Sequence, residues 1–141
     1  MDVQRMVSGS PARRPDSEKI TLNLGFVDLG QVDLLVRDGF YSNRSDFIRT
    51  AIRNQLARHD DVLAAATRRQ ALDLGLRHYD AATLEAVRAR GEMLEIRVLG
   101  LASIAADVTP ELARATIARV DVLGALSASP AVKAALRDRM G

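Results

Sequence analysis

Apolar and polar residues alternate strictly in a short segment near the start of the chain, residues 19–24. Its apolar residues are Ile20, Leu22 and Leu24, and its polar residues are Lys19, Thr21 and Asn23. A period of two predicts a β-strand with one buried face and one exposed face.

The spacing of apolar residues then changes to that of helices. Residues 28–38 predict a first helix, with Asp28 able to cap its start and Gly39 placed to end it. Ser42 is the predicted N-cap of a second helix, which extends over residues 43–59. The apolar stripe of that helix consists of Phe47, Ile48, Ala51, Ile52 and Leu56.

A near-repeat follows in residues 70–141. The dipeptide Leu-Gly occurs at 74–75, 99–100 and 123–124, at intervals of 25 and 24 residues, and each copy ends an alternating apolar run. Each run is followed by a residue suited to cap a helix. These residues are Asp80, Thr109 and Ser129, the last two directly before proline. The pattern predicts three strand–helix units that form a small parallel sheet with helices on one side.

These patterns predict an α+β protein in four segments. Residues 1–17 are expected to be a disordered, weakly basic arm, which is either a plain leader or an arm that enters a minor groove. Residues 18–59 form what we call the N-terminal module. Residues 60–69 are a linker or a helical extension. Residues 70–141 are the repeat unit, with a role in oligomerisation or in binding a partner protein.

Composition and charge limit the classes of function. The net charge is only +2, so affinity for DNA has to come from individually placed contacts. The sequence has no cysteine and two histidines, His59 and His78, so we expect no metal and no cofactor. Motifs of known enzymes are absent, and we expect no catalytic activity. Without an apolar segment of membrane-spanning length or a secretory signal, the expected location is the cytoplasm, at the nucleoid.

The N-terminal module poses a physical problem that a second copy solves. About 40 residues rarely bury enough apolar surface to fold alone, and a single strand leaves its edge unpaired. Two chains that pair residues 19–24 antiparallel remove both difficulties. The expected dimer core is Ile20, Leu22, Leu24, Phe47, Ile48 and Ile52. The resulting two-stranded ribbon has the dimensions to enter the major groove of double-stranded DNA.

The order strand, helix, glycine turn and helix over residues 18–58 resembles the ribbon-helix-helix superfamily of the CopG, MetJ and Arc repressors. The stretch GFYSNRSDFIRTAIR is the most specific part of the resemblance. The resemblance implies that Lys19, Thr21 and Asn23 contact base edges. It also implies that Ser42, Asn43 and Arg44 bind a DNA phosphate at the start of the second helix.

The sequence therefore predicts a DNA-binding transcriptional regulator, a repressor in our interpretation, that acts as a homodimer or a dimer of dimers. One alternative is an antitoxin that regulates its own operon. Another is a dimeric scaffold that does not bind DNA. A nickel sensor is disfavoured, because related nickel-responsive repressors use several histidines and a cysteine as ligands.

Overall fold

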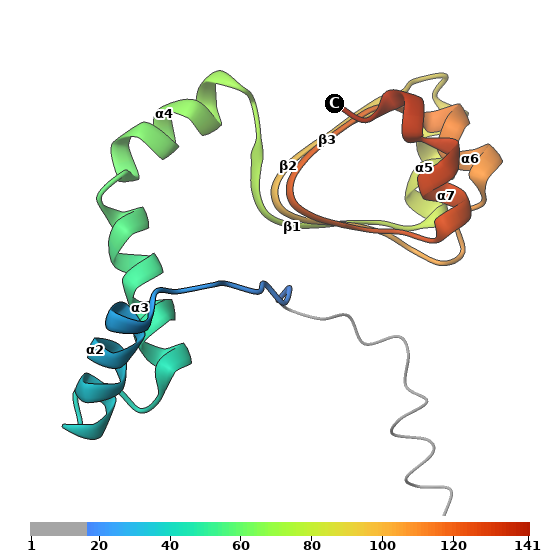
Figure 1. The fold of residues 1–141 in the computed structure, drawn as a ribbon. Coiled ribbons are helices and arrows are strands. Elements are labelled where there is room, and N and C mark those ends of the chain that lie inside the picture. Colours follow the sequence, from blue (N-terminus) through green and yellow to red (C-terminus); the bar gives the residue numbers. More distant parts are fainter. Residues whose placement is uncertain (1–16) are drawn as a thin grey trace, which may run out of the picture. The chain divides into compact units, whose positions relative to one another are not determined.

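The structure, a computed structural model, describes residues 17–141, and the predicted arm lies outside this range except for Ser17. Six helices and a three-stranded sheet make up the described part (Figure 1). The helices are α2 (Phe26–Arg37), α3 (Arg44–Ala57), α4 (Asp60–Arg69), α5 (Ala81–Ala89), α6 (Pro110–Thr116) and α7 (Pro130–Ala135). The strands are β1 (Asp73–Tyr79), β2 (Leu94–Ile104) and β3 (Ile117–Ser127), and a 3₁₀ helix, η1, spans Arg137–Arg139.

Contacts divide the chain into two compact units. The boundary between them in the sequence lies between Ala51 and Ile52, within α3. No helix in the described range combines the length and the apolar character needed to cross a membrane. The segment predicted as a linker or a helical extension forms α4.

Helix α2 ends as the sequence predicts. Gly39 adopts φ 89°, and its amide donates to the Val36 carbonyl over 3.1 Å. The amide of Phe40 donates to the Leu35 carbonyl over 2.9 Å, which completes a Schellman motif. The predicted cap at the other end is wrong. The helix begins at Phe26 after Gly25, with no side-chain cap, and Asp28 lies in the first turn.

Helix α3 is capped one residue later than predicted. The Asn43 side-chain oxygen accepts from the Asp46 amide over 2.8 Å, and the Asp46 carboxylate accepts from the Ser42 amide over 2.9 Å. The prediction that Ser42 is the N-cap is therefore wrong. Both residue types cap helices well, and the helix starts at Arg44, so the cap position falls to Asn43.

Residues 18–25 have no regular secondary structure in the single chain. Their apolar side chains are largely exposed: Ile20 keeps 80% of its surface accessible and Leu22 keeps 61%. A strand needs a partner for its backbone groups, and no described segment of this chain pairs with residues 18–25. The predicted strand, and the dimer that would supply its partner, remain predictions.

The repeat unit contains the predicted parallel sheet. Strand order is β1-β2-β3, with both neighbouring pairs parallel and with Gly75, Gly100 and Gly124 in one register. In Figure 1 the strands overlie one another, and α5, α6 and α7 lie together on the other side of the unit. The three strand–helix units are thus confirmed as successive coils of a small solenoid.

The Leu-Gly dipeptides lie within the strands and do not end them, which corrects the predicted strand ends. The glycines have φ of +118°, +143° and +118°, a region that other residues rarely adopt. A Cβ on Gly100 would stand 2.2 Å from the Gly75 carbonyl oxygen, and one on Gly124 would stand 2.1 Å from that of Gly100. Glycine therefore lets each strand bend and lets the next backbone approach closely.

The predicted helix caps of the repeat unit are all confirmed. Asp80 accepts from the Thr83 amide over 2.8 Å at the start of α5. Thr109 accepts from the Leu112 amide over 3.1 Å at α6. At α7, Ser129 accepts from the Val132 amide over 3.2 Å. Each cap satisfies a free amide where the chain turns from strand to helix.

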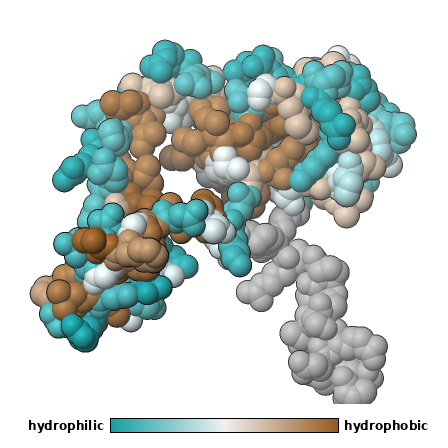
Figure 2. All heavy atoms as spheres, viewed as in Figure 1, coloured by the Kyte–Doolittle hydropathy of each residue, from teal (hydrophilic) through white to brown (hydrophobic). Residues whose placement is uncertain are grey.

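A continuous hydrophobic core fills the space between the sheet and the helices of the repeat unit. Figure 2 shows hydrophobic residues gathered over its strands and more hydrophilic ones over its outer helices. The buried cluster consists of Leu84, Ile96, Val98, Ala102, Ile104, Val108, Leu112, Ala113, Ile117, Val120, Val132 and Leu136. This unit thus buries a substantial core within one chain.

Candidate nucleic-acid interface

The three residues predicted to contact bases lie on the extended segment before α2. Lys19, Thr21 and Asn23 are all exposed, and none forms a hydrogen bond or ion pair with another described residue. A lysine, a threonine and an asparagine at alternate positions offer a cationic donor, a hydroxyl and an amide. These groups match the donors and acceptors of base edges in the major groove.

The predicted dimer core is largely open in the single chain. Ile20, Leu22, Leu24 and Ile52 are 80, 61, 39 and 53% exposed. Phe47 and Ile48 are half-buried, and the Phe47 ring packs edge-on against Tyr41 with centroids 5.0 Å apart.

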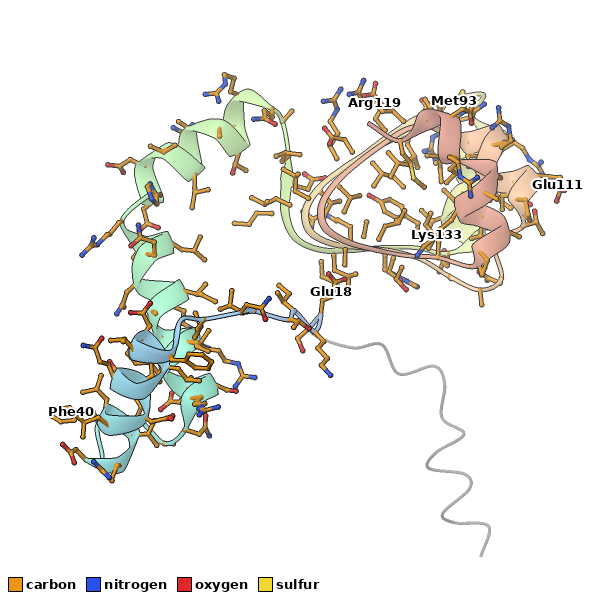
Figure 3. The ribbon with its side chains drawn as sticks, in the orientation of Figure 1. Glu18, Phe40, Met93, Glu111, Arg119 and Lys133 are labelled. Atoms are coloured by element: carbon orange, nitrogen blue, oxygen red, sulfur yellow. The ribbon has the colours of Figure 1, made fainter. Side chains whose placement is uncertain are left out.

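In the described part of the first unit, Val32 is the one buried side chain. Phe26 keeps 93% of its surface exposed, and Phe40 in the turn after α2 keeps 70% (Figure 3). Exposed apolar surface of this extent is typical of regions that contact another molecule.

The start of α3 gathers the three residues predicted to bind phosphate. The amides of Asn43, Arg44 and Ser45 have no acceptor among the described residues, whereas the Ser42 amide is already bonded to Asp46. Free amides at the first turn and the positive end of the helix dipole are the features by which helix starts bind anions, and phosphate binding at this helix start stays a prediction.

The Arg44 side chain is engaged elsewhere. Its Nε and Nη2 donate to the two carboxylate oxygens of Asp33 on α2, over 2.8 and 2.9 Å. This bidentate pair holds the pKa of Asp33 below its usual range and raises the pKa of Arg44 further. The pair is half-exposed, so its contribution to stability is small, and it links the start of α3 to α2.

Sequence reasoning missed Asp33, because it lies 11 residues before Arg44 and on a different helix. Local spacing rules predict only pairs three or four residues apart on one helix.

The remaining arginines of the module are exposed. They are Arg37, Arg49, Arg53 and Arg58. Among the described residues, no three or more His, Asp or Glu side chains lie together as they would around a metal ion. In the repeat unit, His78 Nδ1 lies 3.2 Å from the buried Ser103 hydroxyl.

Comparison with protein families gives a match over most of the chain. A model of a ribbon-helix-helix transcriptional regulator family matches residues 15–133. The match therefore extends over the candidate interface and over most of the repeat unit. Curated proteins and solved structures gave no match.

Proposed function

Because the chain belongs to the ribbon-helix-helix transcriptional regulator family, we propose that it is a sequence-specific repressor that binds the DNA major groove as a homodimer. In this proposal, residues 19–24 of two chains pair antiparallel, and the pair enters the groove. The protein acts in the cytoplasm, at the nucleoid.

The observation that supports the dimer most is the exposed apolar face of the N-terminal module. Ile20, Leu22 and Leu24 occur twice in a ribbon, and burying each such side chain contributes roughly 1.5–3 kcal/mol. The three side chains are 80, 61 and 39% exposed in the single chain, so their six copies together contribute roughly 5–11 kcal/mol, against an association cost of roughly 4–15 kcal/mol. Burial of Ile52 and the backbone hydrogen bonds between the two strands further favour association, so the proposal includes a stable dimer.

Pairing of the strands places the polar residues on the opposite face, where they can contact bases. Lys19 can donate to the acceptors of guanine. Asn23 can form a bidentate pair with adenine, and Thr21 can use its hydroxyl or contact a thymine methyl. The dimer presents each residue twice, so the preferred DNA site has two related halves.

The start of α3 positions the protein on the DNA backbone. The free amides of Asn43 and Arg44 bind a phosphate, and the ion pair with Asp33 keeps the Arg44 side chain directed toward α2. In this proposal the amides make the contact, and the guanidinium orients the helix. Contacts of this kind set the register of the protein, and the ribbon determines the sequence.

A folded repeat unit favours the regulator over the antitoxin, whose toxin-binding tail is commonly short and disordered when free. Residues 70–141 form three coils with a common core. Co-purification with a small toxin encoded nearby would favour the antitoxin instead.

The test begins with selection of bound sequences from a random double-stranded DNA library. Binding of the selected site is then compared for wild type, Lys19→Ala and Asn23→Ala. Each change should weaken binding by about 1–3 kcal/mol and relax the preference at one base pair of each half-site. Lys133→Ala is the matched control, because Lys133 is the only other lysine and lies on α7 of the repeat unit (Figure 3).

Two results would contradict the proposal. One is that the library yields no preferred sequence and that binding at low salt is absent. The other is that Lys19→Ala and Asn23→Ala bind the selected site as well as the Lys133→Ala control does.

A further inference from the structure

The two edges of the parallel sheet are finished differently. At the β3 edge, the C-terminal residues fold back: Met140 bridges Val120, and the Gly141 amide donates to the Val120 carbonyl over 2.8 Å. Arg139 Nη1 donates to the carbonyls of Arg114 and Ile117, over 2.6 and 2.7 Å. The end of the solenoid at β3 is therefore partly closed by its own chain.

The β1 edge has no such cover from the described residues of the repeat unit. Strand β1 pairs only with β2 among the described strands, and the backbone groups on its other side have no strand partner there. Two leucines beside this edge are strongly exposed, Leu74 at 71% and Leu76 at 59%. Solenoids need a terminal cap with a polar outer face, and no strand of the described range caps β1.

The row of aligned glycines, Gly75, Gly100 and Gly124, has open space at its β1 end. Gly100 and Gly124 each lie against the carbonyl of the preceding strand, but no heavy atom beyond the chain neighbours lies within 4 Å of a Cβ built on Gly75. Glycine in a strand often marks a place where another backbone approaches closely. Space for one further strand is thus available beside Gly75.

We propose that the β1 strand of a second copy fills this space, running antiparallel about a two-fold axis at Gly75. Gly75 then lies opposite Gly75 of the other copy, and Leu74 lies opposite Leu76. The two three-stranded sheets become one continuous six-stranded sheet, and the exposed leucines of both copies gather on one face.

In this register the charged residues of β1 in one copy lie opposite residues of the opposite charge in the other copy. Asp73 and Arg77 lie two residues on either side of Gly75, so each faces its opposite charge in the other copy. Within one chain they form only a long pair, with Arg77 Nε 3.8 Å from Asp73 Oδ2, and both side chains are about half-exposed. On the neighbouring strand β2, Asp73 pairs with Val98 and Arg77 pairs with Ala102, both of which are buried. Charges at these positions disfavour pairing of β1 with a strand that has no complementary charges.

A symmetric pair is preferred to head-to-tail stacking of β1 on β3. Stacking of that kind would meet the β3 edge where the C-terminal residues partly close it at Val120, and it would propagate without end. Contact between like edges leaves both closed ends outermost and stops at two copies.

Disulfide trapping in the full-length protein tests the register, because the chain has no cysteine of its own. Two differently tagged chains, one with Leu74→Cys and one with Leu76→Cys, are co-expressed and oxidised without DNA. Directly opposed residues in an antiparallel pair lie about 4.5–5.5 Å apart between Cα atoms, within disulfide range. The mixed disulfide should form at least about ten times more readily than the disulfide of the control Leu123→Cys.

The control is matched in kind and place. Leu123 lies in the same row as Leu74 and Leu99, on β3, and is 49% exposed. Leu74→Cys alone should crosslink less than the mixture. In the proposed register the Leu74 residues of the two copies are diagonal neighbours and do not lie directly opposite each other.

A charge test separates contacts between copies from those within a chain. Asp73→Arg in the Leu74→Cys chain and Arg77→Asp in the Leu76→Cys chain give like charges within each chain and opposite charges between chains. This combination should retain the crosslink, whereas Asp73→Arg in both chains should abolish it.

The proposal is overturned if the mixed pair crosslinks no better than Leu123→Cys, or if the two charge combinations behave alike. The assay contains no DNA, so its failure leaves the proposed DNA contacts of residues 19–24 untouched.

Discussion

The repeat unit and the N-terminal module solve the same folding problem in different ways. The repeat unit buries twelve core residues within one chain, from Leu84 to Leu136. The described part of the first compact unit buries Val32 and leaves Ile20, Leu22 and Phe26 open to solvent. The repeat unit buries its apolar side chains against its own chain. The N-terminal module leaves most of its apolar side chains exposed in the single chain.

The difference arises from where each strand finds its neighbour. In the repeat unit, β2 and β3 follow β1 at a fixed interval, so the neighbouring strands are supplied in cis. The segment 19–24 is followed only by helices until β1. In the proposed dimer a second chain supplies partners for its backbone groups and covers its apolar face, and dimerisation is then part of its folding.

The glycine row gives the largest predicted effect on the stability of the repeat unit. Gly124→Ala places a Cβ against the Gly100 carbonyl at a φ of +118° and should cost roughly 3–6 kcal/mol. In the single chain Gly75→Ala has the same φ with open space around it, so it should cost only roughly 1–3 kcal/mol at protein concentrations too low for the β1 edges of two copies to pair. Urea unfolding followed by circular dichroism measures both, and equal losses would show that the close backbone approach is unimportant.

Substitutions of apolar residues should affect the two regions differently, and the difference should appear when the protein concentration is varied. Ile96→Ala removes a fully buried side chain and should lower the free energy of unfolding by about 2–5 kcal/mol at every protein concentration. Leu22→Ala should instead weaken dimerisation, by about 2–4 kcal/mol for its two copies.

Analytical ultracentrifugation measures the dimer dissociation constant. Leu63→Ala is the control, at a leucine of α4 that is 39% exposed and outside the proposed ribbon. Both proteins also carry Asp73→Arg, which should prevent pairing of the β1 edges, and a Leu22→Ala protein that then dimerises as tightly as the control would contradict the ribbon.

The cap of α3 gives a smaller and local effect. Asn43→Ala removes the acceptor of the Asp46 amide and should destabilise the module by about 1 kcal/mol. Ser42→Ala, one residue earlier, should cost little, because the Ser42 amide and not its hydroxyl bonds to Asp46. Thermal unfolding at one fixed concentration distinguishes the two, and a larger loss for Ser42→Ala would contradict the assigned cap.

The smallest predicted effect is the acid dependence of the Asp33–Arg44 pair. The pKa of Asp33 is lowered in the folded chain, chiefly by its hydrogen bonds to Arg44. Its stabilising contribution is therefore complete above about pH 4 and is lost as the pH falls through the lowered folded pKa. In an NMR titration, Arg44→Gln should bring the pKa of Asp33 back toward its ordinary value. An unchanged titration midpoint would exclude the ion pair in solution.

Periodic features of the fold could be predicted from the sequence. The recurrence of Leu-Gly with a following cap residue predicted the parallel coils and placed Asp80, Thr109 and Ser129 at helix starts. The bend at each glycine could not be predicted in the same way. It depends on the backbone of the neighbouring strand, which appears only when the strands are stacked in register.

The candidate interface was predictable in its local parts only. The pattern of residues 19–24 and the turn at Gly39 are properties of short segments, and the turn is confirmed. The bond between Arg44 and Asp33 joins two helices, and no local rule relates the two positions. The pairing of two ribbons is still further from the sequence, because it depends on a second molecule.

The most direct test of the central claim is an isotope-filtered NMR experiment on a mixture of labelled and unlabelled chains. The account predicts intermolecular contacts between backbone protons of residues 20–24 in the two chains, in antiparallel order, with slowed amide exchange. If residues 20–24 show no intermolecular contacts and exchange freely at concentrations where the protein is dimeric, the ribbon does not form and the claim is wrong.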